Sequence, residues 1–206
     1  MTTSKTNKIL DAAIKVFAEK SYHYATIAEI ASEAAIATGS VYAYFENKLD
    51  LLLSAMLHFF KKVNEVNQRK ISDIENPVDK LHALFVTFQD ILLVDRKALC
   101  LGEVLKEGFP QPHLSKSKKL KQKQQAIYDQ NLVLLNMIDT VIMEGQKKGM
   151  IDSTIKPQVL RQILGGSSQL LFNGLFLQYY RKEEIGYDES DINSAMAMLI
   201  NKFAKH

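Results

Sequence analysis

One stretch, residues 26–48, constrains the fold of this chain more than any other part of the sequence. It reads TIAEIASEAAIATGSVYAYFENK. Thr26 followed three residues later by Glu29 is the pattern of a capping box, which marks the start of a helix. Behind it, apolar residues recur at the three-and-four spacing of one helix face: Ile27, Ile30, Ala31 and Ala34. The stretch therefore begins with a short amphipathic helix.

A tight bend is expected to join this helix to a second one. Ala35 to Ala37 form the predicted bend, with Ile36 as its apolar plug. The second helix is predicted from Thr38 to Phe45, with Val41 and Phe45 docked inward. Two helices joined by such a short turn form a helix-turn-helix, whose second helix enters the DNA major groove. On spacing alone, a helical hairpin buried in a larger bundle is the alternative interpretation.

The residues left outside favour DNA over the buried hairpin. They are Thr38, Gly39, Ser40, Tyr42 and Tyr44. A glycine inside a helix costs about 1 kcal/mol relative to alanine, and close approach of the backbone to a ligand or phosphate would explain it. The hydroxyl groups suit phosphate oxygens and base edges. Lys48 opens the next helix, where its charge and the free N–H groups can both meet a phosphate.

Residues from about Lys8 to Asp50 resemble the DNA-binding domain of the TetR family of bacterial transcriptional regulators. The resemblance rests on the apolar positions of three helices and on family positions occupied here by Gly39, Tyr42, the Tyr44-Phe45 pair and Lys48. Three positions depart from the family pattern. Ser21 and Ala35 replace usual glycines, and Ala37 replaces a frequent capping serine, which forfeits about 1 kcal/mol.

The resemblance and the helical periodicity together predict an all-α fold. We expect a three-helix DNA-binding domain with the helix-turn-helix in residues 1–47, and a six-helix ligand-binding and dimerisation bundle in residues 48–206. The first helix is expected from about Thr6 to Lys20, and a long connecting helix from Lys48 to about Ser72. The later helices are predicted at about 77–92, 95–106, 115–148, 157–182 and 188–204, separated by Pro77, the GFPQP segment (108–112), Gly149, Pro157 and Gly186.

Composition and motifs narrow the function further. The formal net charge of +3 permits nucleic acid binding without indicating it. A single cysteine, Cys100, excludes an intrachain disulfide and fits a reducing compartment. No apolar run is long enough for a membrane span, so we expect a cytoplasmic protein. No catalytic motif occurs. Glu103 and Glu107, four apart, could suggest paired acid/base carboxylates, but they are read as a solvated face or as ion pairs with neighbours of Lys106. We therefore expect no enzyme activity, no cofactor and no metal site.

The resemblance implies a homodimeric, ligand-responsive regulator, most simply a repressor that binds a pseudo-palindromic double-stranded DNA operator. Thr26, Tyr42, Tyr44 and Lys48 match family positions that touch phosphates, and Thr38, Gly39 and Ser40 are expected to face bases. A helical adaptor or small-molecule-binding protein without sequence-specific DNA binding is the alternative. In the family the last two helices form the dimer, and here they offer two apolar faces: Ile163, Leu164, Leu170, Leu171 and Leu175, and Ile192, Met196, Leu199, Ile200 and Phe203.

The C-terminal half resembles, more weakly, family members that respond to long-chain fatty acyl-CoA. The segments EVLKEGFPQP and IDTVIMEGQKKGMID carry this resemblance. It implies a small apolar effector. We expect its binding site to be lined by Phe85, Phe88, Leu101, Leu105, Met137 and Phe172. A lysine cluster, Lys116, Lys118, Lys119, Lys121 and Lys123, is read as a solvated face or as a contact for effector phosphates. A second DNA contact is disfavoured because that helix is assigned to the distal bundle.

Overall fold

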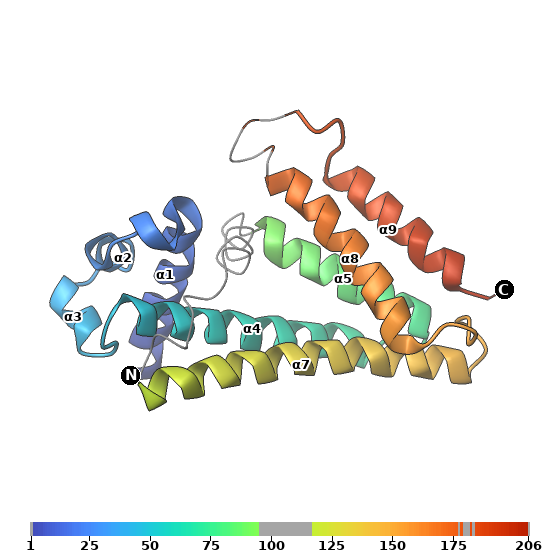
Figure 1. The fold of residues 1–206 in the computed structure, drawn as a ribbon, viewed down its shortest axis with the longest axis horizontal. Coiled ribbons are helices and arrows are strands. Elements are labelled where there is room, and N and C mark those ends of the chain that lie inside the picture. The colour runs from blue at the N-terminus through green and yellow to red at the C-terminus, as the bar shows by residue number, and fades with distance from the viewer. Residues whose placement is uncertain (1, 95–116, 177, 179–181, 183, 206) are drawn as a thin grey trace. The chain divides into compact units, whose positions relative to one another are not determined.

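The computed structural model describes residues 2–94, 117–176, 178, 182 and 184–205, and all of its named elements are helices (Figure 1). The all-helical prediction is confirmed. The predicted helix at 95–106, the GFPQP segment and Lys116 lie outside the described residues. The helices are α1 (Thr2–Tyr24), α2 (Ile27–Glu33), α3 (Thr38–Tyr42), α4 (Lys48–Ser72), α5 (Pro77–Val94), α7 (Lys118–Lys147), α8 (Pro157–Phe176) and α9 (Glu189–Phe203).

The chain divides into two compact units, each discontinuous in sequence. Unit 1 comprises Met1–Val63 and Ile91–Asn131, and unit 2 comprises Asn64–Asp90 and Leu132–His206. These ranges differ from the predicted ranges 1–47 and 48–206. The beginning of α4 and the first part of α7 belong to unit 1 together with the three N-terminal helices.

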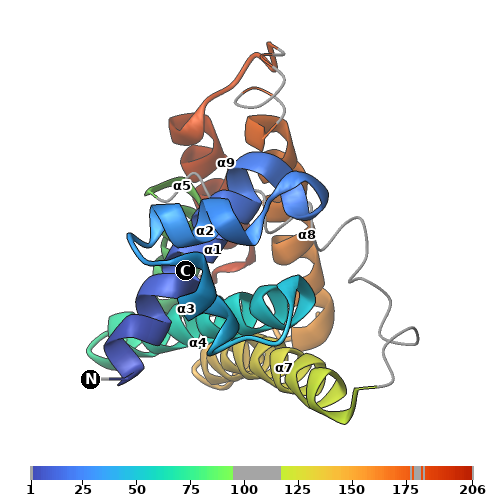
Figure 2. The same cartoon turned by 90° about the vertical axis from the view of Figure 1, so that its left-hand side faces the viewer.

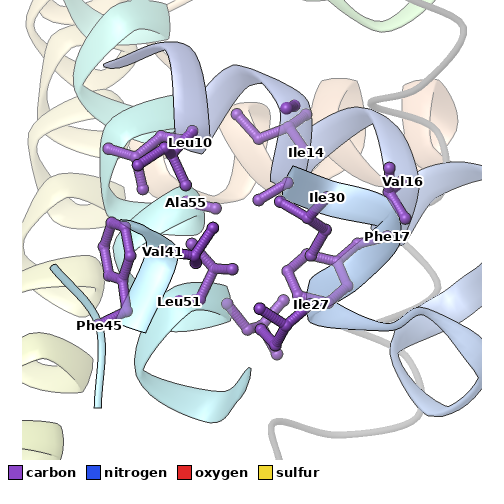
Figure 3. Close-up of a cluster of buried hydrophobic side chains, with 14 of the residues drawn as sticks. Leu10, Ile14, Val16, Phe17, Ile27, Ile30, Val41, Phe45, Leu51 and Ala55 are labelled. Atoms are coloured by element: carbon purple, nitrogen blue, oxygen red, sulfur yellow. The ribbon is translucent and has the colours of Figure 1, made fainter. Parts of the chain in front are cut away.

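Unit 1 has a single apolar core under its short helices (Figure 3). Phe17 of α1, Ile30 of α2, Val41 of α3 and Leu51 of α4 are all fully buried there. Each such side chain contributes about 1.5–3 kcal/mol when it leaves water. Leu120 and Ile127 of α7 complete the same core. The start of α7 therefore contributes to the same core as the N-terminal helices and α4.

Two residues that replace the family's usual glycines have positive φ. Ser21 interrupts α1 near its end (φ 60°, ψ 165°), and Ala35 follows α2 with φ 53°. A side chain with a Cβ is disfavoured in such conformations, which glycine adopts freely. The bend after α2 thus keeps its left-handed geometry even though alanine occupies it. The first helix is also longer than the predicted Thr6–Lys20.

The predicted second helix of the helix-turn-helix is shorter than expected. It ends at Tyr42 rather than at Phe45, because the amides of Tyr44 and Phe45 both donate to the carbonyl of Val41 (3.0 Å each) and close a turn. Ala37 makes no side-chain cap, as its alanine side chain requires. Val41 and Phe45 are nonetheless buried as predicted. The inward anchors of α3 are therefore correct, while its length is not.

Unit 2 is built from α8, α9, α5 as far as Asp90 and the remaining parts of α4 and α7, with α8 packed against α9. Pro77 begins α5, and the side chain of Asn76 accepts from the Val78 amide at 2.8 Å. Gly149 ends the turn after α7 with φ 72°, as predicted. The α8 helix is described as far as Phe176, and Lys182 has φ 54° and lies outside the helix, while residues 177 and 179–181 of the predicted extension are outside the described part.

Within the described ranges, no helix is long and apolar enough to cross a membrane. The same residues contain no group of three histidine, cysteine, aspartate or glutamate side chains placed to hold a metal ion. His58 pairs with Asp11 at 3.2 Å, and His82 contacts the amide oxygen of Asn201 at 3.1 Å. These two histidines therefore bind neighbouring side chains of the protein.

Replacing Ala35 by glycine should stabilise unit 1. The substitution removes a Cβ from a position with positive φ, and we expect a gain of about 1 kcal/mol in the free energy of unfolding. Ala34 is the matched control, because its φ is −75°. Ala34→Gly should instead lower stability, since glycine gains nothing there and loses more entropy on folding. Urea denaturation of both variants checks this, and equal effects at the two positions would contradict the assignment.

Candidate nucleic-acid interface

The helix before the bend is fixed by a complete capping box. The Glu29 amide donates to the Thr26 hydroxyl oxygen (3.2 Å), and the Thr26 amide donates to the Glu29 carboxylate (2.9 Å). Lys20 pairs with the same carboxylate at 2.5 Å. The bonds from Lys20 and Thr26 lower the pKa of Glu29 to about 2. Thr26 remains exposed, but its hydroxyl group already has partners within the protein.

The exposed surface of α3 contains four of the predicted DNA contacts. Thr38, Gly39, Ser40 and Tyr42 are exposed, while Val41 between them is fully buried in the unit 1 core. A Cβ added at Gly39 would meet no atom within 4 Å. Packing within the chain therefore does not require a glycine at this position, although glycine makes the helix less stable than alanine would. The outer face of α3 is small, polar and open, as a groove-reading surface requires.

Tyr44 differs from the other four residues. It is half-buried and packs against the unit 1 core, with its ring centroid 6.5 Å from that of Phe45. The expectation that Tyr44 stays mostly outside is wrong. It helps to fix the turn after α3.

Lys48 begins α4 as predicted, but its ammonium group is held by the protein itself. It donates to the carbonyl oxygens of Ala25 (2.9 Å) and His23 (3.2 Å), and it lies 4.6 Å from the ring centroid of Tyr22. Carbonyls at the end of a helix lack intrahelical partners, and a lysine can satisfy them. Lys48 therefore joins the end of α1 to the start of α4. This role was not predicted, because 23 residues or more separate it from its partners.

A buried carboxylate lies in the first turn of α4. The Asp50 side chain is 0% exposed, and it accepts from the Glu46 amide at 3.0 Å. Lys123 of α7 pairs with it directly, and Lys119 approaches it at 3.4 Å. Burial alone would raise the pKa of Asp50, but the bonds from Lys123 and the Glu46 amide outweigh it, so the pKa is lowered.

The same two lysines make further contacts that fix α7 against the loop after α3. Lys123 donates to the Ser54 hydroxyl at 2.6 Å, and Lys119 pairs with Glu46 at 2.8 Å. Both views of the fold show the start of α7 beside the start of α4 (Figures 1 and 2). The assignment of this lysine cluster to the distal bundle is therefore wrong for Lys119 and Lys123. Their ammonium groups lie against acidic side chains of unit 1, instead of being left for effector phosphates.

The predicted effector residues are only partly described. Phe85 on α5 is buried and Met137 on α7 is half-buried, and both belong to unit 2. Phe88 and Phe172 lie on α5 and α8, but their side chains are outside the described part, as are Leu101 and Leu105 entirely. The proposed lining therefore remains a prediction.

Breaking the Asp50 pair should destabilise the protein strongly. Lys123→Met leaves a carboxylate buried without its main partner, and we expect a loss of about 3 kcal/mol in the free energy of unfolding. Lys121→Met is the matched control, because Lys121 is exposed on the same helix.

The same pair predicts a pH dependence. A lowered pKa means that Asp50 contributes stability above its ordinary pKa of about 3.9 and loses it as the pH falls through its folded value. Below about pH 4, wild-type protein should therefore lose stability more steeply than Asp50→Asn. Parallel curves for the two proteins in acid denaturation would contradict this role of Asp50.

Comparisons with known proteins agree with this geometry. Residues 9–55 match the family described as bacterial regulatory proteins, tetR family. The fatty acid metabolism regulator protein of Bacillus subtilis (strain 168) is 30% identical over 166 residues, which cover 78% of this chain and 77% of that protein.

Two solved structures share the fold. The fatty acid degradation regulator FadR from Bacillus halodurans has a TM-score of 0.74 and 24% identity, over 95% of this chain and 94% of that one. FadR from Bacillus subtilis, crystallised in complex with stearoyl-CoA, has a TM-score of 0.72 and 23% identity, over 94% and 96%.

Proposed function

We propose that this chain, which belongs to the TetR family of bacterial regulatory proteins and is therefore a DNA-binding transcriptional regulator, acts as a homodimeric repressor released by an acyl-CoA. The observation that carries the DNA-binding part is the exposed polar face of α3 above its buried Val41 anchor. The family is one of regulators rather than enzymes. An adaptor without DNA binding is accordingly set aside.

For the operator, we propose that Thr38, Gly39 and Ser40 face bases and that Tyr42 contacts a phosphate. The short outer side chains let the α3 backbone come close to base edges, and the tyrosine hydroxyl can donate to a phosphate oxygen. One helix reads only a short half-site, so a two-fold dimer should bind a pseudo-palindrome. Its recognition helices should be spaced by one helical turn of DNA, about 34–36 Å, or a multiple.

The sequence predicts that Lys48 and Thr26 contact phosphates, but we propose that they mainly position the DNA-binding surface. Because the ammonium group of Lys48 binds two carbonyls, its effect on DNA would come chiefly through the backbone N–H groups at the start of α4 and through the position of that helix. Thr26 would likewise hold the start of α2 near the phosphates. Both residues would thus orient the DNA-binding surface more than they contact it.

Tyr42→Phe should weaken binding to every operator sequence alike, by about three- to tenfold, because it removes one phosphate hydrogen bond worth about 1 kcal/mol. Ser40→Ala should instead change the relative affinities of operators altered at one base pair. The control is Tyr128→Phe, since Tyr128 is an exposed tyrosine of α7. Fluorescence anisotropy with a set of operator variants measures all three. A change of sequence preference in Tyr42→Phe would refute its assignment to a phosphate.

For the dimer, the residues of the predicted faces differ in burial, and Leu171, Leu199 and Phe203 are half-buried. Leu164, Leu175, Ile192, Met196 and Ile200 are buried within unit 2, so they belong to the core of the chain. A charge at Met196 would disrupt that core whether or not a dimer forms. Ile163 and Leu170 are exposed, as are Val159 and Met198, which periodicity had not selected. We assign the dimer interface to these four exposed residues.

Leu170→Glu combined with Met198→Glu should separate the dimer without unfolding the chain. The two side chains are 73% and 72% exposed, so charges there leave the core of unit 2 intact. Light scattering should then report a mass near one 23.3 kDa chain, and operator affinity should fall. Met143→Glu, at an exposed methionine of α7, is the control and should stay dimeric. A double variant that remains dimeric would rule out this surface.

For the effector, the proposal rests on the relative crystallised with stearoyl-CoA and on the apolar interior of unit 2. An acyl chain needs a deep apolar site, and bundle helices commonly form one. Binding need only favour a conformation whose α3 helices no longer match the operator. A hundredfold preference for that conformation corresponds to about 2.7 kcal/mol of coupling. By the same linkage, bound DNA should weaken the effector equally.

A further inference from the structure

The part of α4 that belongs to unit 2 carries asparagine at two interior positions. Asn64 is 7% exposed and Asn67 is 0% exposed, whereas Glu65 and Gln68 beside them are exposed. Residues three apart lie on the same helix face. The inner face of α4 is therefore polar at a level where a helix of a bundle ordinarily carries apolar residues.

The amide of Asn67 is buried without a partner among the described residues. Neither its oxygen nor its nitrogen makes a hydrogen bond there. Two other buried polar side chains of unit 2 have partners: the Thr87 hydroxyl donates to the Ala83 carbonyl (2.7 Å), and Asp139 pairs with Arg161 (2.8 Å). An unpaired buried amide lowers stability. Within the described part of the chain, the burial of the Asn67 amide is therefore not explained by a hydrogen bond of the protein itself.

We infer that the Asn67 side chain is a polar contact of the effector site and binds an amide group of the effector. This inference rests on the proposed acyl-CoA response. A carboxamide presents an acceptor and two donors side by side, and another amide is the group that can use both kinds at once. The pantetheine arm of acyl-CoA carries two amides. A free fatty acid carries a carboxylate, which only accepts, so it would leave the Asn67 oxygen without a donor.

The interior of unit 2 combines many apolar side chains with a few polar groups. Leu81, Leu84 and Phe85 of α5 are buried in this unit. A second buried polar group of the unit, the Ser168 hydroxyl on α8, is 2% exposed and also lacks a hydrogen bond within the described part of the chain. Small-molecule sites are mostly apolar and use a few polar groups to fix the orientation of the ligand. Asn67 supplies such a group.

The test compares two Asn67 variants with wild type on the protein's own operator. Asn67→Leu replaces the amide by an apolar group of similar size, and Asn67→Ala removes it without adding bulk. Operator release is followed by anisotropy during titration with acyl-CoAs of increasing chain length, free CoA and palmitate. Wild type should be released by long-chain acyl-CoA. Both variants should need at least about tenfold more acyl-CoA, a loss of about 1.4 kcal/mol, with an unchanged response to palmitate.

Measurements of thermal stability distinguish a role of Asn67 in ligand binding from a defect in core packing. Asn67→Leu should raise the melting temperature without effector, because an unpaired amide has been removed. The control Thr87→Val removes a buried hydroxyl that is already bonded, and it should leave effector sensitivity unchanged. Wild type that no acyl-CoA releases would overturn the effector proposal and this inference together. Release of wild type and both Asn67 variants at the same acyl-CoA concentration would overturn the inference alone and leave Asn67 with a structural or water-binding role.

Discussion

The DNA-binding unit depends on one buried charge, the carboxylate of Asp50. A buried carboxylate is costly unless it is paired and hydrogen-bonded, and here the Glu46 amide and two lysines of α7 surround it. Because Glu46 lies in the loop that follows α3, these bonds fix the turn that holds the recognition helix. The geometry of α3 therefore depends on a helix more than sixty residues further along the chain.

Local signals in the sequence predicted much of the fold. The Thr26-Glu29 capping box, the start of α5 at Pro77 and the stop at Gly149 were each correct, because each is decided by residues close together in the chain. The predicted length of α3 was wrong, since the amides of Tyr44 and Phe45 both donate to the carbonyl of Val41 and end the helix early. Ala35 shows a further limit. Tertiary packing imposes a conformation that its own side chain disfavours.

The candidate site was predictable where exposure follows from helical periodicity. Thr38, Gly39, Ser40 and Tyr42 are exposed as their spacing indicated. The partners of Lys48, Lys119 and Lys123 could not be predicted, because they are distant in sequence and a lysine run has no local sign of pairing. Asn67 left a signal of another kind: a polar residue within the apolar periodicity of α4.

Exchange of domains between family members would have to preserve the contacts of α7 with α4 and with the loop after α3. A fusion joined at residue 47 or 48 would separate Glu46 from Asp50 and Lys119, and it would remove Leu120 and Ile127 from the core they complete. The N-terminal helices alone would then lose the bonds that fix the loop after α3 and would carry an open apolar surface. A transplantable DNA-reading module from this protein would need the first half of α7 as a second, non-contiguous piece.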